Sequence, residues 1–234
     1  MKHIDIWSDF ACPYCYIGER RLKDAIRELG VGHEVEINYR AFELDPNAPV
    51  KPQGETVERL AAKYGMTLEE AKQKVESIER LGRDLGIDFR FGKAKSCNTL
   101  DAHLLMKFAE DNYEKAVVEA LNEALFAANF TENKVLSDRK VLIDIAEKVG
   151  IDPAQAKEVL DQGLYTNQVR YDEQQATSMG VHGVPYMVFD GEFAVPGAIS
   201  TDDCKTCLRD MLSKVKEKPQ NMKGAECDEK GCSL

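Results

Sequence analysis

The chain has 234 residues, 43% of them hydrophobic, which is enough for a well-buried core. This length is long for one domain and short for two full ones, so we expect one core domain with a sizeable insertion. A formal net charge of −10 and a pI near 5.0 argue against a nucleic-acid partner and against an anionic membrane surface. Because the sequence shows no apolar stretch of signal-peptide length, we expect a cytoplasmic protein that does not associate with membranes.

The first structural signal along the chain is a C-x-x-C pair, Cys12 and Cys15, between a short apolar strand at residues 4–7 and a helix. Pro13 has the fixed φ that suits a first helical turn, and apolar residues recur at helical spacing up to residue 29. Unpaired backbone N–H groups and the positive end of the helix dipole stabilise a thiolate there, so we expect a lowered pKa for Cys12. Cys12 is therefore the candidate nucleophile, and the more shielded Cys15 is the candidate resolving thiol.

The next segments leave the first helix and enter a long helical region. Residues 35–41 alternate between apolar and polar side chains, which predicts a strand, and the proline-rich residues 44–54 predict a loop. From about residue 55 the apolar period becomes helical, and a capping box formed by Thr67 and Glu70 opens a helix that runs to residue 86. Further helices are expected over residues 98–111, 113–128, 137–149 and 153–162.

A strand signal returns after a helix expected over residues 166–179. Two apolar strands, at residues 186–189 and 192–195, flank Asp190-Gly191, which is a strong signal for a two-residue hairpin turn. A last helix begins at Ser200 or Thr201 and runs to about residue 218. The charged residues 219–234 that follow are expected to form a flexible tail.

The predicted elements form a β-α-β unit, a helical block and a β-β-α unit, with the C-x-x-C pair at the first strand-to-helix junction. This order is the thioredoxin arrangement, and ligands of open α/β sheets gather at the carboxyl ends of the strands, where Cys12 stands. We predict an α/β protein with a thioredoxin fold and an inserted all-helical subdomain. The expected divisions are a thioredoxin-like domain at 1–54 and 166–218, a helical insertion at 55–165 and a tail at 219–234.

Three stretches resemble the DsbA superfamily of thiol-disulfide oxidoreductases, and more closely its FrnE-like cytoplasmic branch, over roughly residues 3–217. They are Asp9 to Cys15, Asn98 to His103, and Gly180 to Pro185. The resemblance implies a cis peptide bond at Val184–Pro185 facing the two cysteines. It also implies that the backbone of Val184 docks an extended substrate strand, which makes Val184 and Pro185 candidate substrate-binding residues.

The same superfamily includes kappa-class glutathione transferases and hydroxychromene-carboxylate isomerases, which resemble the chain in layout. These enzymes typically carry serine where this chain has Cys12, so the presence of both sulfurs favours disulfide chemistry over isomerisation of a small molecule. The Pro13-Tyr14 dipeptide is also the one that glutaredoxins use, which keeps glutathione as a candidate reductant. Since Pro13 and Tyr14 supply no cation, we expect them to set a moderate redox potential, on the order of −180 to −230 mV.

The remaining cysteines have more than one interpretation. Cys204 and Cys207 fall on one apolar face of the last helix, which favours core packing over an accessory redox pair or a zinc site shared with the first pair. Cys227 and Cys232 lie in the tail and form a candidate accessory redox pair whose disulfide exchanges with Cys12 as an internal relay, or they are irrelevant to it. Cys97 stands alone and favours a structural role.

One histidine is a candidate modulator of the nucleophile. His182 lies in the turn before Pro185, where a positive charge would lower the pKa of Cys12. The alternative interpretation is a surface histidine. We expect no metal and no cofactor other than the redox-active cysteine pair.

Three functions are compatible with the sequence. The favoured one is a cytoplasmic thiol-disulfide oxidoreductase or disulfide isomerase that acts on disulfide-containing proteins or peptides and is recycled by glutathione or a thioredoxin-type system. The alternatives are a glutathione-dependent transferase or isomerase of small molecules, and a chaperone-like peptide binder that uses the thiols as a switch. The direction of electron flow, the physiological substrate and the oligomeric state stay open.

Overall fold

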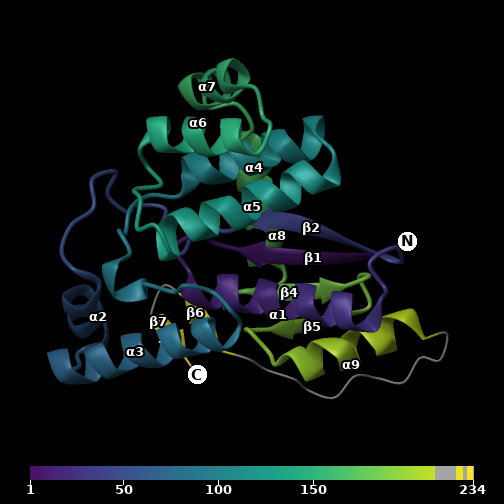
Figure 1. Ribbon diagram of the computed structural model, residues 1–234, viewed down its shortest axis with the longest axis horizontal. Helices are drawn as coiled ribbons and strands as arrows, with labels where there is room; N and C mark the ends of the chain where they lie inside the picture. The colour runs from purple at the N-terminus through teal and green to yellow at the C-terminus, as the bar shows by residue number, and fades with distance from the viewer. Residues whose placement is uncertain (214–224, 229–230, 234) are drawn as a thin grey trace. The chain divides into compact units, whose positions relative to one another are not determined.

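The computed structural model describes residues 1–213, 225–228 and 231–233 (Figure 1). Its contacts divide the chain into two compact units, Met1–Leu44 together with Gln175–Leu234, and Asp45–Gln174. The boundary between the first unit and the helical unit follows Leu44, whereas residue 54 was predicted. The loop after Leu44 belongs to the second unit because Asn98 of that unit binds it. Its backbone N–H donates to Pro49 O over 3.1 Å, and its side-chain amide donates to Pro46 O over 3.2 Å.

The first unit contains a four-stranded sheet in the order β2-β1-β4-β5. Its strands are β1 Lys2–Ser8, β2 Val35–Ala41, β4 Tyr186–Phe189 and β5 Phe193–Pro196. The strands β1 and β2 are parallel and are joined by α1, Pro13–Leu29, whereas the β1–β4 and β4–β5 pairs are antiparallel. This arrangement confirms the predicted α/β thioredoxin fold.

The predicted hairpin joins β4 to β5. Asp190 and Gly191 both have positive φ, 49° and 67°, as a two-residue turn of the mirror-image type requires. The turn sets Phe189 opposite Phe193, and their rings stack with centroids 5.1 Å apart. The Asp-Gly signal therefore located the turn, but the strands pair Phe189 with Phe193, so three residues, 190–192, separate them instead of the predicted two, and the second strand begins one residue later than predicted.

Helices α1 and α9, Thr201–Leu212, pack together against the sheet and bury its main core. Ser200 caps α9 by accepting a hydrogen bond from Asp203 N over 3.1 Å, as predicted, while the expected extension to residue 218 lies outside the described residues. Cys204 and Cys207 belong to this core, which confirms their packing role. The core residues are Ile4, Ile6, Leu22, Ala25, Val35, Met187, Phe189, Val195, Ile199, Cys204, Cys207, Leu208 and Met211.

A second, small sheet is formed by the end of the chain. Strand β3, Gly183–Val184, pairs with β6, Glu226–Asp228, which pairs in turn with β7, Gly231–Ser233. Residues 219–234 were predicted to form a flexible tail, and the two strands differ from that prediction. Apart from Ala225 and the two strands, this segment lies outside the described residues. The sequence offers little apolar surface there, but the edge of β3 supplies backbone partners that a strand can satisfy.

The second unit is helical, as predicted for the insertion. Its elements are α2 Thr56–Tyr64, α3 Leu68–Asp84, a short 3-10 helix Phe91–Lys93, α4 Leu100–Asn112, α5 Lys115–Phe130, α6 Arg139–Lys148, α7 Pro153–Gln162 and most of α8 Thr166–Ser178. The capping box of Thr67 and Glu70 is present at the start of α3. The side chain of Asp152 caps α7, where Pro153 takes the first helical position.

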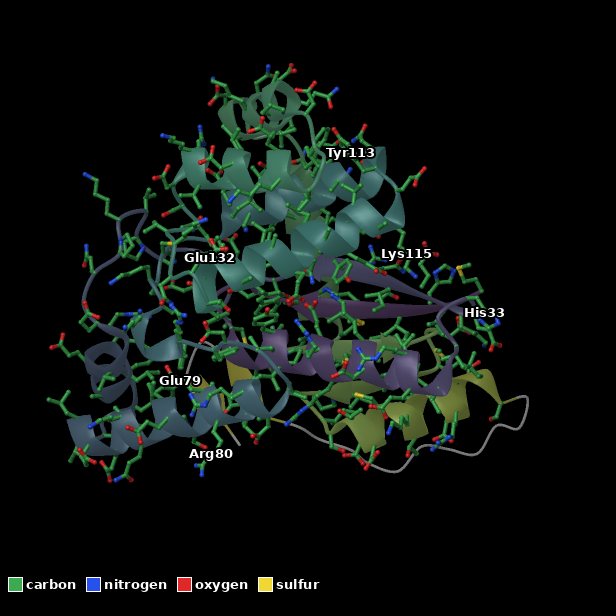
Figure 2. The ribbon with its side chains drawn as sticks, in the orientation of Figure 1. His33, Glu79, Arg80, Tyr113, Lys115 and Glu132 are labelled. Carbon is green, nitrogen blue, oxygen red and sulfur yellow. The ribbon has the colours of Figure 1, made fainter. Side chains whose placement is uncertain are left out.

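Polar side chains tie the helices of the second unit together. Tyr113 Oη donates to Gln155 Oε1 over 3.0 Å and accepts from Asp152 N over 3.2 Å, which fixes the start of α7 (Figure 2). Glu79 on α3 accepts a hydrogen bond from Gly92 N over 3.0 Å. None of the helices within the described residues is long and apolar enough to cross a membrane.

Candidate active site

Cys12 is the N-cap residue of α1. Its backbone is extended, with φ −95° and ψ 114°, and its sulfur accepts a hydrogen bond from Cys15 N over 3.3 Å. A sulfur that accepts a backbone N–H at the positive end of a helix is suited to carry negative charge. The sequence therefore placed Cys12 correctly at the helix start, and the structure adds that its sulfur is the cap.

Cys15 lies in the first turn of α1 and is fully buried behind Cys12. Burial raises the pKa of the Cys15 thiol well above its ordinary value, and the hydrogen bond to Cys12 raises it further. Its backbone also donates toward Cys12 O over 3.2 Å. The environments of the two sulfurs are therefore different, since the Cys15 thiol has a raised pKa and the Cys12 sulfur accepts a backbone N–H at the start of the helix.

Val184 and Pro185 stand beside this pair, joined by the cis peptide bond that the resemblance implied. The thiol of Cys12 donates a hydrogen bond to Val184 O over 3.5 Å. Pro185 approaches α1 closely, since a Cβ on Gly18 would lie 3.1 Å from Pro185 Cγ. Glycine at this helical position therefore gives Pro185 its room next to the cysteines.

A buried polar pair behind Cys15 escaped the sequence prediction. Ser8 Oγ donates to Glu19 Oε1 over 2.9 Å, and the Ser8 hydroxyl also bonds to Cys15, which lowers the pKa of that thiol against the effect of burial. Glu19 is only 2% exposed, and Lys23 Nζ lies 3.9 Å from Glu19 Oε2. The signal for this pair was present in the sequence, because Glu19 falls four residues after Cys15 and thus on its helix face.

Asp9 shapes the loop that leads into the motif. Its carboxylate accepts hydrogen bonds from Ala11 N over 3.0 Å and from Leu44 N over 2.7 Å, and its side chain is buried. Its backbone carbonyl accepts from Cys12 N over 2.9 Å. Asp9 therefore joins the end of β1, the C-x-x-C loop and the chain after β2, a role that requires long-range contacts and has no local sequence signal.

The other predicted residues occupy different settings. Tyr14 is buried, whereas the side chain of His182 is exposed, and its effect on Cys12 stays a prediction. The backbone of Cys227 pairs opposite Val184, and Cys232 pairs opposite Cys227. The structure thus brings the backbone of Cys227 next to Val184, whose carbonyl oxygen accepts from Cys12.

Two remaining features bear on the cysteine alternatives. Cys97 is buried in the helical unit. Within the described part of the chain, no three His, Cys, Asp or Glu side chains gather as a metal site would require. Cys204 and Cys207 are buried in the core of the first unit.

This geometry agrees with the comparison to known proteins. A model of the DSBA-like thioredoxin domain matches residues 3–209, so the chain belongs to the DSBA-like thioredoxin domain family. The resemblance to the DsbA superfamily is thereby confirmed.

The proteins to which the chain is similar include a probable oxidoreductase, an uncharacterized protein and an isomerase. A crystal structure of a probable DsbA oxidoreductase from Streptomyces coelicolor is 29% identical, covers 100% of this chain and 99% of that chain, and superposes with a TM-score of 0.85. An uncharacterized protein, YwbO, from Bacillus subtilis (strain 168) is 28% identical over 91% of this chain and 98% of its own. The 2-hydroxychromene-2-carboxylate isomerase of Sphingobium xenophagum is 25% identical over 82% of this chain and 90% of its own.

Proposed function

We propose that the chain is a thiol-disulfide oxidoreductase or disulfide isomerase that acts on disulfide-containing proteins or peptides through Cys12 and Cys15. The observation that carries this proposal is the asymmetry of the two sulfurs. Cys12 Sγ caps a helix 3.5 Å from Val184 O, while the buried Cys15 has a raised pKa. Membership of a family whose members are thiol-disulfide oxidoreductases supports the same chemistry.

The first step is attack by the Cys12 thiolate on one sulfur of the substrate disulfide. The substrate S–S bond breaks, its other sulfur leaves as a thiolate and takes up a proton, and a mixed disulfide joins Cys12 to the substrate. The hydrogen bond from Cys15 N to Cys12 Sγ favours Cys12 as the attacking group. The high pKa of Cys15 keeps the second thiol from competing for the substrate.

In the second step Cys15 loses its proton and attacks Cys12 Sγ. A Cys12–Cys15 disulfide forms, the substrate leaves with two thiols, and the substrate has gained the two electrons that the cysteine pair lost. Two molecules of glutathione, or one dithiol of a thioredoxin-type protein, then reduce the pair for another turnover. An isomerase instead releases the substrate from the mixed disulfide when a different substrate thiol attacks it.

Four residues outside the C-x-x-C motif have proposed roles. The backbone of Val184, with Pro185 beside it, docks an extended substrate segment next to Cys12, as its position in strand β3 allows. Cys227 and Cys232 form an accessory pair whose dithiol passes two electrons and two protons to the Cys12–Cys15 disulfide and is itself left as a disulfide. The pairing of Cys227 opposite Val184 supports that relay.

The cellular setting rests on the resemblance to the FrnE-like branch, from which we propose a cytoplasmic location and no cofactor beyond the cysteine pair. Pro13 and Tyr14 would set its redox potential, and His182 would raise the reactivity of Cys12 when charged. The absence of a cation between the two cysteines favours reduction or isomerisation over bulk oxidation.

A second candidate is glutathione-dependent isomerisation or transfer on a small molecule. The match to 2-hydroxychromene-2-carboxylate isomerase favours it. In that case Cys12 and Val184 would hold glutathione instead of a polypeptide, and Cys15 would be dispensable.

Trapping separates the two functions. The Cys15→Ser variant lacks the resolving thiol, so the oxidoreductase proposal predicts accumulation of mixed disulfides between Cys12 and proteins in a cell extract, identified by non-reducing electrophoresis and mass spectrometry. The Cys12→Ser variant is the matched control and should trap nothing. Glutathione as the sole adduct, together with full activity of Cys15→Ser on an isomerase substrate, would establish the second candidate.

A further inference from the structure

The edge of strand β3 next to Cys12 is already paired in this structure. Strand β6 runs antiparallel to β3, with Asp228 opposite Gly183 and Cys227 opposite Val184. Just before β6, Ala198 N donates to Ala225 O over 2.7 Å, which anchors the approaching chain at a second point. The chain's own residues 225–228 thus lie as an extended segment along the residues that would dock a substrate.

The segment lies on the side of β3 where the nucleophile stands. Strand β6 contacts α1 as well as β3, and the two are seen side by side near the start of that helix (Figure 1). Val184 links both features, because its carbonyl oxygen is 3.5 Å from Cys12 Sγ and its backbone pairs with Cys227. Cys12 itself is fully buried in this arrangement, although a nucleophile must be reached by its substrate.

A strand edge offers its outward row of backbone donors and acceptors to one partner at a time. An incoming peptide that pairs with Gly183 and Val184 on this side therefore has to replace β6. Because β6 belongs to the same chain, the peptide competes against an effective concentration on the order of millimolar. The cost appears as a weaker apparent affinity, set by the fraction of molecules in which the edge is free.

We propose that residues 225–228 act as a built-in pseudo-substrate that blocks peptide docking until it leaves the β3 edge. This inference rests on the proposed function and adds its regulation, and it does not depend on electron transfer by the tail sulfurs. It also defines the partner that the edge accepts. That partner is an extended peptide segment, antiparallel to β3, with its half-cystine opposite Val184.

The test compares two full-length variants that both lack the tail sulfurs. Adjacent N–H groups of a strand point to opposite sides, so prolines at Glu226 and Cys227 remove one donor from each side of β6. In the proline variant, Glu226→Pro, Cys227→Pro, Cys232→Ser, the tail strand cannot pair with β3. Its matched control, the serine control, is Glu226→Ser, Cys227→Ser, Cys232→Ser. Both are assayed for reduction of a disulfide-containing peptide by glutathione, and for the rate at which iodoacetamide modifies Cys12, read by mass spectrometry.

The proline variant should show an apparent KM about three- to tenfold below that of the serine control, the gain expected if the edge is free in only a tenth to a third of molecules. Its Cys12 should be alkylated faster by a similar factor. A synthetic peptide of residues 222–234 with both cysteines replaced by serine should inhibit the proline variant competitively. Equal KM values and equal alkylation rates in the two variants would overturn the proposal.

The alkylation arm keeps this inference separate from the proposed function. If neither variant reduces the peptide, the oxidoreductase proposal fails, but the relative rates of Cys12 alkylation still decide whether the tail strand shields the site. Circular dichroism of both variants checks that the substitutions leave the folded domain intact. A variant that has lost its helical signal is replaced by Cys227→Ser, Asp228→Pro, Cys232→Ser, compared with Cys227→Ser, Asp228→Ser, Cys232→Ser.

Discussion

Ser8 Oγ lies 2.9 Å from Glu19 Oε1, and both side chains are buried directly behind Cys15. The hydroxyl of Ser8 contacts the Cys15 sulfur and the Glu19 carboxylate at the same time, so it connects a thiol that must lose its proton to a group that can accept one. Burial raises the pKa of Cys15, and a protonated thiol is a poor nucleophile. The pair therefore bears on the second step of the proposed reaction and not on the first.

Replacing Glu19 by glutamine should slow the resolving step. The amide keeps the size of the side chain but cannot take the proton of Cys15, so we expect release of the reduced substrate to slow by about 100-fold at pH 7, the lower end for general acid–base catalysis. Formation of the mixed disulfide should be unchanged. Rapid-quench single-turnover measurements with acid trapping resolve the two steps.

The pH profile separates this role from a merely structural one. In the Glu19→Gln variant the resolving rate should recover as the pH rises, since hydroxide replaces the lost acceptor. Ser8→Ala should show the same selective loss, because it breaks the connection between Cys15 and Glu19. Equal slowing of both steps in these variants would argue against proton transfer.

Asp9 should be important for the stability of the active-site loop. Its buried carboxylate accepts from Ala11 N and Leu44 N, and hydrogen bonds to charged groups contribute about 1.5–3 kcal/mol. We expect Asp9→Ala to lower the free energy of unfolding in urea by about that amount and to reduce turnover. Asp9→Asn keeps one acceptor oxygen, so its free energy of unfolding should fall by less than that of Asp9→Ala. An equally large fall in both variants would show that the negative charge of Asp9 carries the stabilisation.

Cys204 should make the protein less stable at alkaline pH. Burial raises the pKa of the Cys204 thiol from its ordinary 9.0 to about 12, so between these values the unfolded chain releases a proton that the folded chain retains. Stability is therefore fully present below pH 9 and falls as the pH rises toward 12, by at most about 1.4 kcal/mol per pH unit for one group. Burial acts on Cys207 in the same direction and raises its pKa to about 11.

Urea unfolding at pH 8 and pH 10.5 measures this effect. The difference in unfolding free energy between the two pH values should be smaller in Cys204→Val than in the unsubstituted protein, because valine has no thiol to ionise and fills a similar volume. An unchanged difference would show that Cys204 does not set the alkaline limit. Neither buried thiol should react with iodoacetamide in the folded protein at pH 8.

The redox potential of the Cys12–Cys15 pair should be moderate. The intervening Pro13 and Tyr14 bring no cation to the thiolate, so we expect a value of about −180 to −230 mV in a glutathione titration. Cys227→Ser, Cys232→Ser is the control that removes the second pair from the titration. A value near about −120 mV, typical of strong oxidants, would contradict the proposed reductive or isomerase role.

Local patterns in the sequence determined most of the first unit and the helices of the second. The capping residues Thr67, Asp152 and Ser200 each mark a helix start, and Asp190-Gly191 marks the hairpin, because these features depend on backbone groups a few residues apart. The C-x-x-C pair at the end of β1 follows from the same kind of short-range signal. The position of Cys12 at the helix start was therefore available from the sequence alone.

Only the tertiary structure decided what surrounds that nucleophile. Asp9 and Glu19 are charged residues whose burial depends on partners brought in by the fold, and the tail strand forms because β3 has an open edge beside it. None of these contacts has a local pattern, since each joins residues from different elements or distant parts of the chain. The sequence predicted Cys12 and Cys15 as a reactive pair, whereas the fold determined the burial of Glu19, the contacts of the Asp9 carboxylate and the strand that pairs with Val184.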